Sequence, residues 1–185
     1  MSNSTEISLK LSSEEEATSP AIDLTQEVIR LFDTYHQAIF GYLYRMVDAD
    51  RALAEELTQE TFLKVFETRQ QLPDIVNRRA WLYRIATNLA LNVQKRRHRF
   101  RWLPWLRSYE TRGKQDDLSG TELRVDLEHA LEKLPPSLRA PLLLSTVHGL
   151  NSREIAEVLN ISEGAVRTRV YRAREQLRTL FVDEV

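Results

Sequence analysis

The sequence predicts an all-α protein made of two small helical domains joined by a flexible linker. Three observations predict this fold class. Apolar residues recur every three or four positions along most of the chain, which is the spacing of a buried helix face. No stretch of useful length alternates apolar and polar residues as a strand does. A segment rich in Pro, Gly and Asp, residues 104–121, divides the helical patterns into two groups.

Composition excludes several classes of protein. With 185 residues, 42% of them hydrophobic, the chain is long enough to bury at least one core. No run approaches the roughly 18 apolar residues that a membrane span requires, and the N-terminus lacks the pattern of a secretory signal. The absence of cysteine excludes disulfides, thiolate metal sites and cysteine nucleophiles. We therefore expect a cytoplasmic protein.

The first group of helices follows an N-terminal arm, residues 1–22, which is rich in Ser, Thr and Glu and which we expect to be disordered. Asp23, with Gln26 three positions later, predicts the start of a helix that ends near Val47. Its apolar positions are Val28, Leu31, Phe32, Tyr35, Ile39, Leu43 and Met46.

A second helix follows residues 48–50 and ends before residue 70, and Pro73 supports this break because proline interrupts helices. Its apolar face comprises Leu53, Leu57, Thr61, Phe62, Val65 and Phe66. A third helix begins near Asn77 and places Leu82, Ile85, Ala86, Leu89 and Val93 on one face. The adjoining flank carries Arg84, Asn88, Lys95 and Arg99, so we expect that flank to be exposed and cationic.

The second group of helices ends in a helix-turn-helix pattern at about residues 151–171. A helix over "VDLEHALEKL" precedes a buried helix over "SLRAPLLLSTVHG", which Gly149 ends. Asn151 with Glu154 predicts the cap of the next helix, and Asn160 tolerates the left-handed turn after it. Ser162 then caps the last helix.

The last helix has a buried side and an arginine-rich side. Val166, Val170, Ala173 and Leu177 recur at helical spacing and fix the buried side. The other side presents Arg167, Thr168, Tyr171 and Arg172 as candidate base readers. Arg169, Arg174 and Arg178 are expected to be phosphate or structural contacts. Such a helix fits the DNA major groove, where the arginine fork can hold a guanine edge. The alternative is a solvated face of a helical bundle.

The formal net charge of -1 conceals two basic clusters. Residues 78–112 hold ten Lys or Arg and a single acid, Glu110. The second cluster is the arginine run of the last helix, and acidic segments elsewhere offset both. The chain therefore predicts two separate nucleic-acid footprints.

Three strings in one order carry a family resemblance. "ELTQETFLKVFETR", then "RRAWLYRIATNLALNVQKRRHR", then the helix-turn-helix resemble the extracytoplasmic-function (ECF, group IV) branch of the sigma-70 family of bacterial RNA polymerase sigma factors. The resemblance covers about residues 24–181. It implies that residues 23–103 form sigma region 2, 104–121 a linker, and 122–185 sigma region 4, which reads the minus-thirty-five element.

The resemblance also implies a division of roles. Region 2 docks on the clamp of the largest polymerase subunit, region 4 contacts the flap of the second-largest subunit, and an anti-sigma factor controls the protein, which can hold it near the membrane. The clamp contacts would be Glu56, Gln59, Glu60, Phe62 and Lys64. The minus-ten element would be melted and read by Leu72, Arg84, Asn88, Lys95, Arg96, Arg97 and Arg99.

Some of these side chains have a second interpretation. A flipped base needs amide hydrogen bonds, which Asn88 can supply, while Leu72 offers an apolar wall. Core packing is the alternative role for Phe62, Phe66 and Trp81. Trp102 and Trp105 either form a stacking surface for single-stranded DNA or pack the linker against a domain or partner.

Two other classes of function are alternatives. The four histidines show no metal-ligand spacing and no glycine-rich phosphate loop is present, so we expect no enzyme, metal or cofactor. A stand-alone helix-turn-helix repressor or activator is the stronger alternative. It would need a ligand or dimerisation domain, whereas the first domain carries a basic flank of its own.

Overall fold

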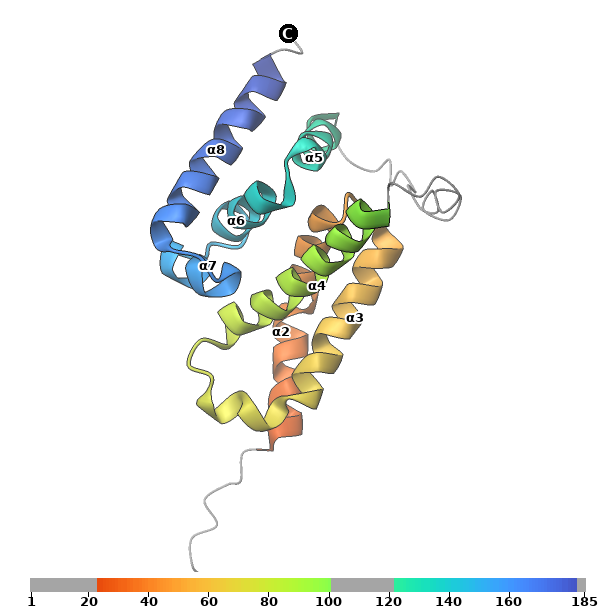
Figure 1. Cartoon of the computed structure of the whole chain (residues 1–185). Coiled ribbons are helices and arrows are strands. Elements are labelled where there is room, and N and C mark those ends of the chain that lie inside the picture. The colour runs from red at the N-terminus through yellow and green to blue at the C-terminus, as the bar shows by residue number, and fades with distance from the viewer. Residues whose placement is uncertain (1–22, 101–121, 183–185) are drawn as a thin grey trace, which may run out of the picture.

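The computed structural model describes residues 23–100 and 122–182, and both parts are built from helices (Figure 1). The all-α fold class is thereby confirmed. The N-terminal arm, the linker with Trp102 and Trp105, and the last three residues lie outside the described residues.

The first domain contains α2 (Leu24–Met46), α3 (Arg51–Glu67), a short 3-10 helix η1 (Arg69–Asp74) and α4 (Arg78–Phe100). Asp23 caps α2 as predicted, since its carboxylate accepts a hydrogen bond from the Thr25 amide at 3.0 Å. The predicted break before Pro73 is confirmed, since α3 ends at Glu67, and the 3-10 helix that follows has a fully buried Leu72. The apolar side chain of Leu72 thus anchors the connection between α3 and α4 in the core.

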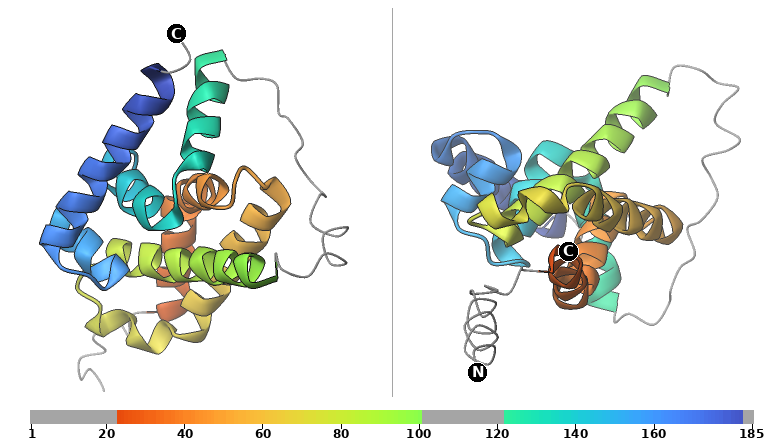
Figure 2. Two further views of the ribbon diagram at one scale, coloured as in Figure 1. Left: turned by 45° about the horizontal axis from the view of Figure 1, so that its top comes forward. Right: turned by 90° about the horizontal axis from the view of Figure 1, so that it is seen from below.

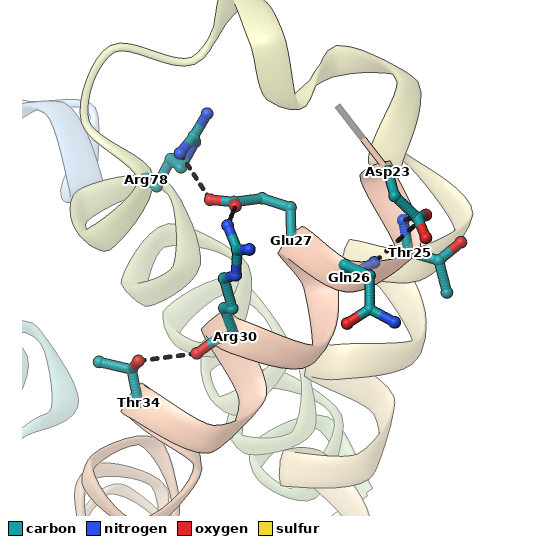
Figure 3. A network of polar contacts seen from close by, with 7 residues as sticks. All are labelled: Asp23, Thr25, Gln26, Glu27, Arg30, Thr34 and Arg78. Carbon is teal, nitrogen blue, oxygen red and sulfur yellow. Dashed lines mark hydrogen bonds and ion pairs between the residues drawn. The ribbon is translucent and has the colours of Figure 1, made fainter. Parts of the chain in front are cut away.

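The start of α2 is tied to the start of α4 by an ion pair (Figure 3). Arg78 Nη1 donates to Glu27 Oε1 at 2.6 Å, and the same carboxylate lies 3.5 Å from Arg30. Because Glu27 is mostly buried while both arginines are partly exposed, this pair fixes where the two helices meet.

The second domain contains α5 (Glu122–Lys133), α6 (Pro136–Thr146), α7 (Ser152–Leu159) and α8 (Glu163–Val182). The predicted capping box at Asn151 and Glu154 is confirmed, with both reciprocal hydrogen bonds present. Asn160 adopts the predicted left-handed conformation, with φ of 52°. Gly149 has φ of 62°, a conformation that costs glycine little, and it turns the chain between α6 and α7.

The two domains pack directly against each other, and their cores form one continuous cluster. Helix α7 contacts α4, and both α5 and α6 contact α2, as Figures 1 and 2 show from different sides. The sequence predicted two domains but not this packing. Its physical basis is a set of polar contacts between side chains far apart in the sequence, described below.

Most of the predicted apolar positions lie in the core, but two aromatic residues differ. Phe32 and Phe66 are each 42% exposed, on α2 and α3. Phe62, between them, is 7% exposed and meets Phe32 edge to face, with ring centroids 4.9 Å apart. Core packing therefore accounts for Phe62 and not for the two residues beside it.

Candidate nucleic-acid interface

Helix α8 presents its arginine-rich side to solvent. Val166 and Ala173 are buried, and Val170 and Leu177 pack against the core at partial exposure. On the other side Arg167, Thr168, Tyr171, Arg172 and Arg174 are exposed, while Arg169 is intermediate. The predicted inner and outer sides of this helix are confirmed. A 65% exposed tyrosine such as Tyr171 has no packing role to explain its position.

The exposed side chains on α8 differ in the ion pairs and hydrogen bonds that they form within the protein. Arg167 lies 3.7 Å from Glu163 in an exposed pair, and the Thr168 hydroxyl donates to the Gly164 carbonyl at 3.0 Å. Arg172 and Arg174 form no ion pair with any residue in the described ranges. Exposed ion pairs of this kind contribute little to stability, so Arg167 can exchange Glu163 for a phosphate or a base at small cost.

Helix α4 presents the second basic surface. Arg84, Asn88, Lys95 and Arg99 are exposed, as the helical spacing predicted. Arg96 is exposed as well. Arg97 differs from them, because its guanidinium lies 2.9 Å from Asp50, the cap of α3, and is half-buried. An arginine already paired with a carboxylate offers less net charge to DNA than its neighbours do.

The two residues expected beside a flipped base lie in different environments. Asn88 is exposed on α4. Leu72 has no exposed surface and belongs to the core, so in this conformation it supports the domain from within and lines no open pocket. Trp81 packs against the core at partial exposure and also borders a cavity of about 710 Å³ between the start of α4 and α7. Part of the Trp81 side chain therefore packs in the core, and part of it faces the cavity.

The candidate polymerase-binding residues lie along α3. Glu56 and Gln59 are exposed, and Glu60 pairs with Lys64 at 3.5 Å. Beside them Leu63 is 56% exposed, a residue that the sequence reasoning missed. Together with Phe66, it makes this helix face unusually apolar for a surface. The sequence indicates Leu63 only as an apolar residue that does not fall on the buried face of α3.

A histidine and two tyrosines meet at the joint between the domains. The Tyr83 hydroxyl lies 2.8 Å from Nδ1 of His148, and Tyr42 packs edge to face against both rings. Burial, reinforced by Arg45 and Arg79, lowers the pKa of His148 to about 4. Burial likewise raises the pKa of Tyr83 to about 12. The cluster is therefore uncharged at neutral pH.

Arg139 makes the second joint and is a residue that the sequence reasoning missed. It is only 2% exposed, although it carries a charge. Its guanidinium donates to five acceptors, namely the carbonyls of Arg45, Met46, Glu132 and Leu134 and the carboxylate of Asp48. In the sequence, the buried role of Arg139 is indicated only by its position as a single cation inside the apolar run "SLRAPLLL".

A third contact joins α7 to the start of α4. The Asn77 amide donates to Glu154 Oε1 at 2.9 Å, while the other carboxylate oxygen accepts from the Asn151 amide at 2.8 Å. The Asn151 amide, followed by Asn77, lowers the pKa of Glu154. One carboxylate thus caps α7 and binds the first domain.

Comparison with protein families matches both domains. The profile described as Sigma-70 region 2 matches residues 31–100, and that described as Sigma-70, region 4 matches residues 124–177. RNA polymerase sigma factor CarQ of Myxococcus xanthus is 35% identical over 151 residues, covering 81% of this chain and 86% of CarQ. ECF RNA polymerase sigma factor SigW of Bacillus subtilis is 30% identical over 162 residues, covering 80% and 85%.

A longer relative and two solved structures add to these matches. ECF RNA polymerase sigma factor SigE of Mycolicibacterium smegmatis is 36% identical over 146 residues, which span 76% of this chain but 56% of SigE. Sigma factor RpoE of Bartonella quintana, solved with the anti-sigma factor NepR, matches with a TM-score of 0.67 at 21% identity over 84% of this chain and 97% of RpoE. CnrH, solved with the cytosolic domain of CnrY, gives 0.61 at 21% identity over 87% and 91%. At these identities the two structures establish the shared fold.

Proposed function

Since the chain belongs to the ECF group of the sigma-70 family of RNA polymerase sigma factors, we propose that each of its two basic helices reads one promoter element. In this proposal residues 23–103 are region 2 and residues 122–185 are region 4, with 104–121 as the linker. The observation that carries it is the presence of two exposed basic helix faces, on α4 and α8, in separate domains of one chain. The role is one of binding and directing polymerase, not of catalysis.

Region 4 reads the minus-thirty-five element through α8. Arg167, Thr168, Tyr171 and Arg172 reach base edges in the major groove, and Arg169 and Arg174 contact phosphates. The full exposure of this side supports the assignment, as does the absence of an ion pair at Arg172 within the described residues.

Region 2 opens and reads the minus-ten element. Asn88 binds a flipped base through its amide, and Leu72 anchors η1 in the core of the same domain. The phosphates of the opened strand are contacted by Arg84, Lys95, Arg96 and Arg99, with Arg97 contributing after it leaves Asp50. These phosphate contacts do not distinguish one base sequence from another.

The face of α3 docks on the polymerase clamp through Glu56, Gln59, Glu60 and Lys64. Leu63 and Phe66 supply the apolar part of this surface, because they are 56% and 42% exposed. The Arg69 guanidinium lies 4.3 Å from the centre of the Phe66 ring and borders this apolar part. Phe62 supports the surface from the core. Region 4 contacts the flap, and an anti-sigma factor, as named in the RpoE structure, restrains the protein in the cytoplasm.

Reconstituted transcription tests the proposal. Purified core RNA polymerase is incubated with fragmented genomic DNA of the native host, with and without this protein, and transcript starts are sequenced. We expect a small set of starts that depend on the protein and share two upstream elements. If the protein binds duplex DNA but never supports initiation, it is a stand-alone helix-turn-helix regulator and the proposal fails.

A further inference from the structure

We propose that the N-terminal arm covers an exposed apolar patch on α2 and α3 through its residues 7–11. The patch consists of Ile29, Phe32, Leu63 and Phe66. The docking of the arm does not depend on the function proposed above. Its consequence, that polymerase displaces the arm from Phe66, rests on that function.

The patch gathers half of the strongly exposed large apolar side chains. Eight such side chains occur in the described residues, and the four of the patch are 42–56% exposed. Ile29 and Phe32 share a face of α2 because they are three positions apart, as Leu63 and Phe66 do on α3. Phe62 joins the two faces, since its ring meets Phe32 at 4.9 Å. Exposed apolar side chains gathered in this way mark an interaction surface.

The arm contains one short apolar stretch, "ISLKL", at residues 7–11. Its apolar side chains are those of Ile7, Leu9 and Leu11. All three fall on one side of an extended chain, and Ile7 and Leu11 also share one face of a helix. Three apolar side chains among Ser, Thr and Glu cannot form a core of their own, and segments of this kind become ordered by binding a surface.

The arm ends where the patch begins. Residue 22 precedes Asp23, the cap of α2, and Ile29 and Phe32 lie about 9 and 14 Å further along that helix. Residues 12–22 connect the apolar stretch to α2 and can span up to about 36 Å, which exceeds both distances. So short a tether gives the stretch an effective concentration on the order of millimolar at the patch. Even a weak contact is then occupied.

The charges of the arm follow the order of the charges beside the patch. Residues 14–16 are three glutamates, and they lie closer to α2 in the chain than the apolar stretch does. At the start of α2 they meet Arg30, whose side chain is 77% exposed, and Arg69 of η1, which lies against α2 (Figure 1). Arg69 pairs with no carboxylate within the described ranges. Lys10, inside the apolar stretch, suits Asp33, which is exposed further along α2.

Docking of the arm and of polymerase exclude each other at one residue. Phe66 belongs to the patch and also to the face of α3 assigned to the clamp. An arm seated on Phe66 therefore has to leave before polymerase binds there. If the arm is docked about three quarters of the time, the apparent affinity for polymerase is about fourfold weaker than without it.

Paramagnetic relaxation in the full-length chain tests the docking. The protein has no cysteine, so S8C provides a single site for a nitroxide label within the apolar stretch. The label broadens the methyl signals of side chains that stay close to it. We expect strong broadening at Ile29 and Leu63. We expect none at Leu127, which is exposed on α5, far from the start of α2 (Figure 1).

The arm variant combines I7S with L11S in the S8C background. It removes two of the three apolar side chains of the stretch and changes no residue of the two domains. Broadening at Ile29 should fall at least threefold, to the level that the tether alone produces. The matched control, S4N with S13N, changes two polar residues of the arm and should keep the broadening. Equal broadening in variant and control refutes the docking.

A mixture distinguishes the chain's own arm from that of a second copy. Nitroxide-labelled S8C protein without isotopes is mixed with isotope-labelled protein that carries no nitroxide. We expect no broadening at Ile29 in this mixture. Broadening there would mean that a second copy covers the patch, and it would overturn the proposal.

Titration with core RNA polymerase tests the displacement. The variant I7S with L11S should bind polymerase about fourfold more tightly than the control does. Equal affinities, with the arm docked, would mean that polymerase does not displace it, and this step would be wrong. A protein that binds no polymerase, yet shows broadening that the variant loses, contradicts the proposed function and leaves the docking intact.

Discussion

Helices α4 and α8 both carry exposed arginines, yet they are held in different ways. Helix α4 buries Ala80, Leu82, Tyr83, Ala86 and Ala90, and its main neighbours come from both domains. Helix α8 buries only Val166 and Ala173 among its described side chains and packs against its own domain. Helix α8 is therefore held mainly by its own domain, whereas α4 is held by helices of both domains.

Substitution of Arg139 is expected to have the largest effect on stability, and it tests whether the contact between the domains matters. Arg139→Met should lower the free energy of unfolding by about 3 kcal/mol, because it leaves buried carbonyls without a donor. Urea unfolding followed by circular dichroism measures the change. Arg178→Met, at an exposed pair with Glu175, is the control and should change stability by less than about 0.5 kcal/mol. Equal effects would mean that the buried charge has no special part in the joint.

Arg172→Ala tests α8 as the reader of the upstream element. Losing a bidentate base contact should weaken binding to promoter duplex by about 1–3 kcal/mol. The measurement is fluorescence anisotropy with a promoter found by reconstituted transcription. Arg178→Ala on the same helix should have a smaller effect, and the assignment is wrong if the two variants lose the same amount.

Asn88→Ala tests α4 as the element that reads opened DNA. Loss of the amide hydrogen bonds should cost about 1 kcal/mol in open-complex formation. Permanganate reactivity of unpaired thymines measures the opening, and a footprint over the upstream element should be unchanged. A variant that loses the upstream footprint as well contradicts the division between α4 and α8.

A smaller effect is expected with pH, since His148 is only partly buried. Its folded pKa of about 4 lies below the ordinary value of 6.5, so the folded protein disfavours the charged form. The stabilisation is complete above pH 6.5 and is lost progressively as pH falls from 6.5 to about 4. Unfolding measured across this range should show the loss, and His148→Gln should reduce it. Parallel curves for both proteins would exclude His148 as the cause.

The smallest effect separates two neighbours on α4. Arg96 is exposed, whereas Arg97 is paired with Asp50. Arg96→Ala should lower the slope of log affinity against log salt by about 0.9, the contribution of one phosphate contact, and Arg97→Ala by less. Salt titrations of DNA binding measure both slopes. A larger loss at Arg97 would mean that Asp50 releases it fully on DNA.

Local chemistry in the sequence determined most of the elements. Caps at Asp23 and Asn151 and the left-handed turn at Asn160 depend on residues within four positions, so they were predictable and are confirmed. The inner face of α8 was predictable for the same reason, because helical spacing fixes which side chains share a side. The break at Pro73 was predicted and is confirmed, but the 3-10 helix that occupies it was not predicted, because it depends on Leu72 reaching the core.

What only the tertiary structure decided is the relation between the two domains. Arg139 and Asp48 are 91 positions apart, Tyr83 and His148 are 65 apart, and Asn77 and Glu154 are 77 apart. Helical periodicity carries no information about such pairs, because it reports only which residues share a face of one helix. The sequence by itself therefore determined two helical domains with two basic surfaces. Tertiary packing decided that α4, which carries one of those surfaces, also contacts α7 of the second domain. The polar side chains buried at this contact are hydrogen-bonded across it, as buried polar groups generally are.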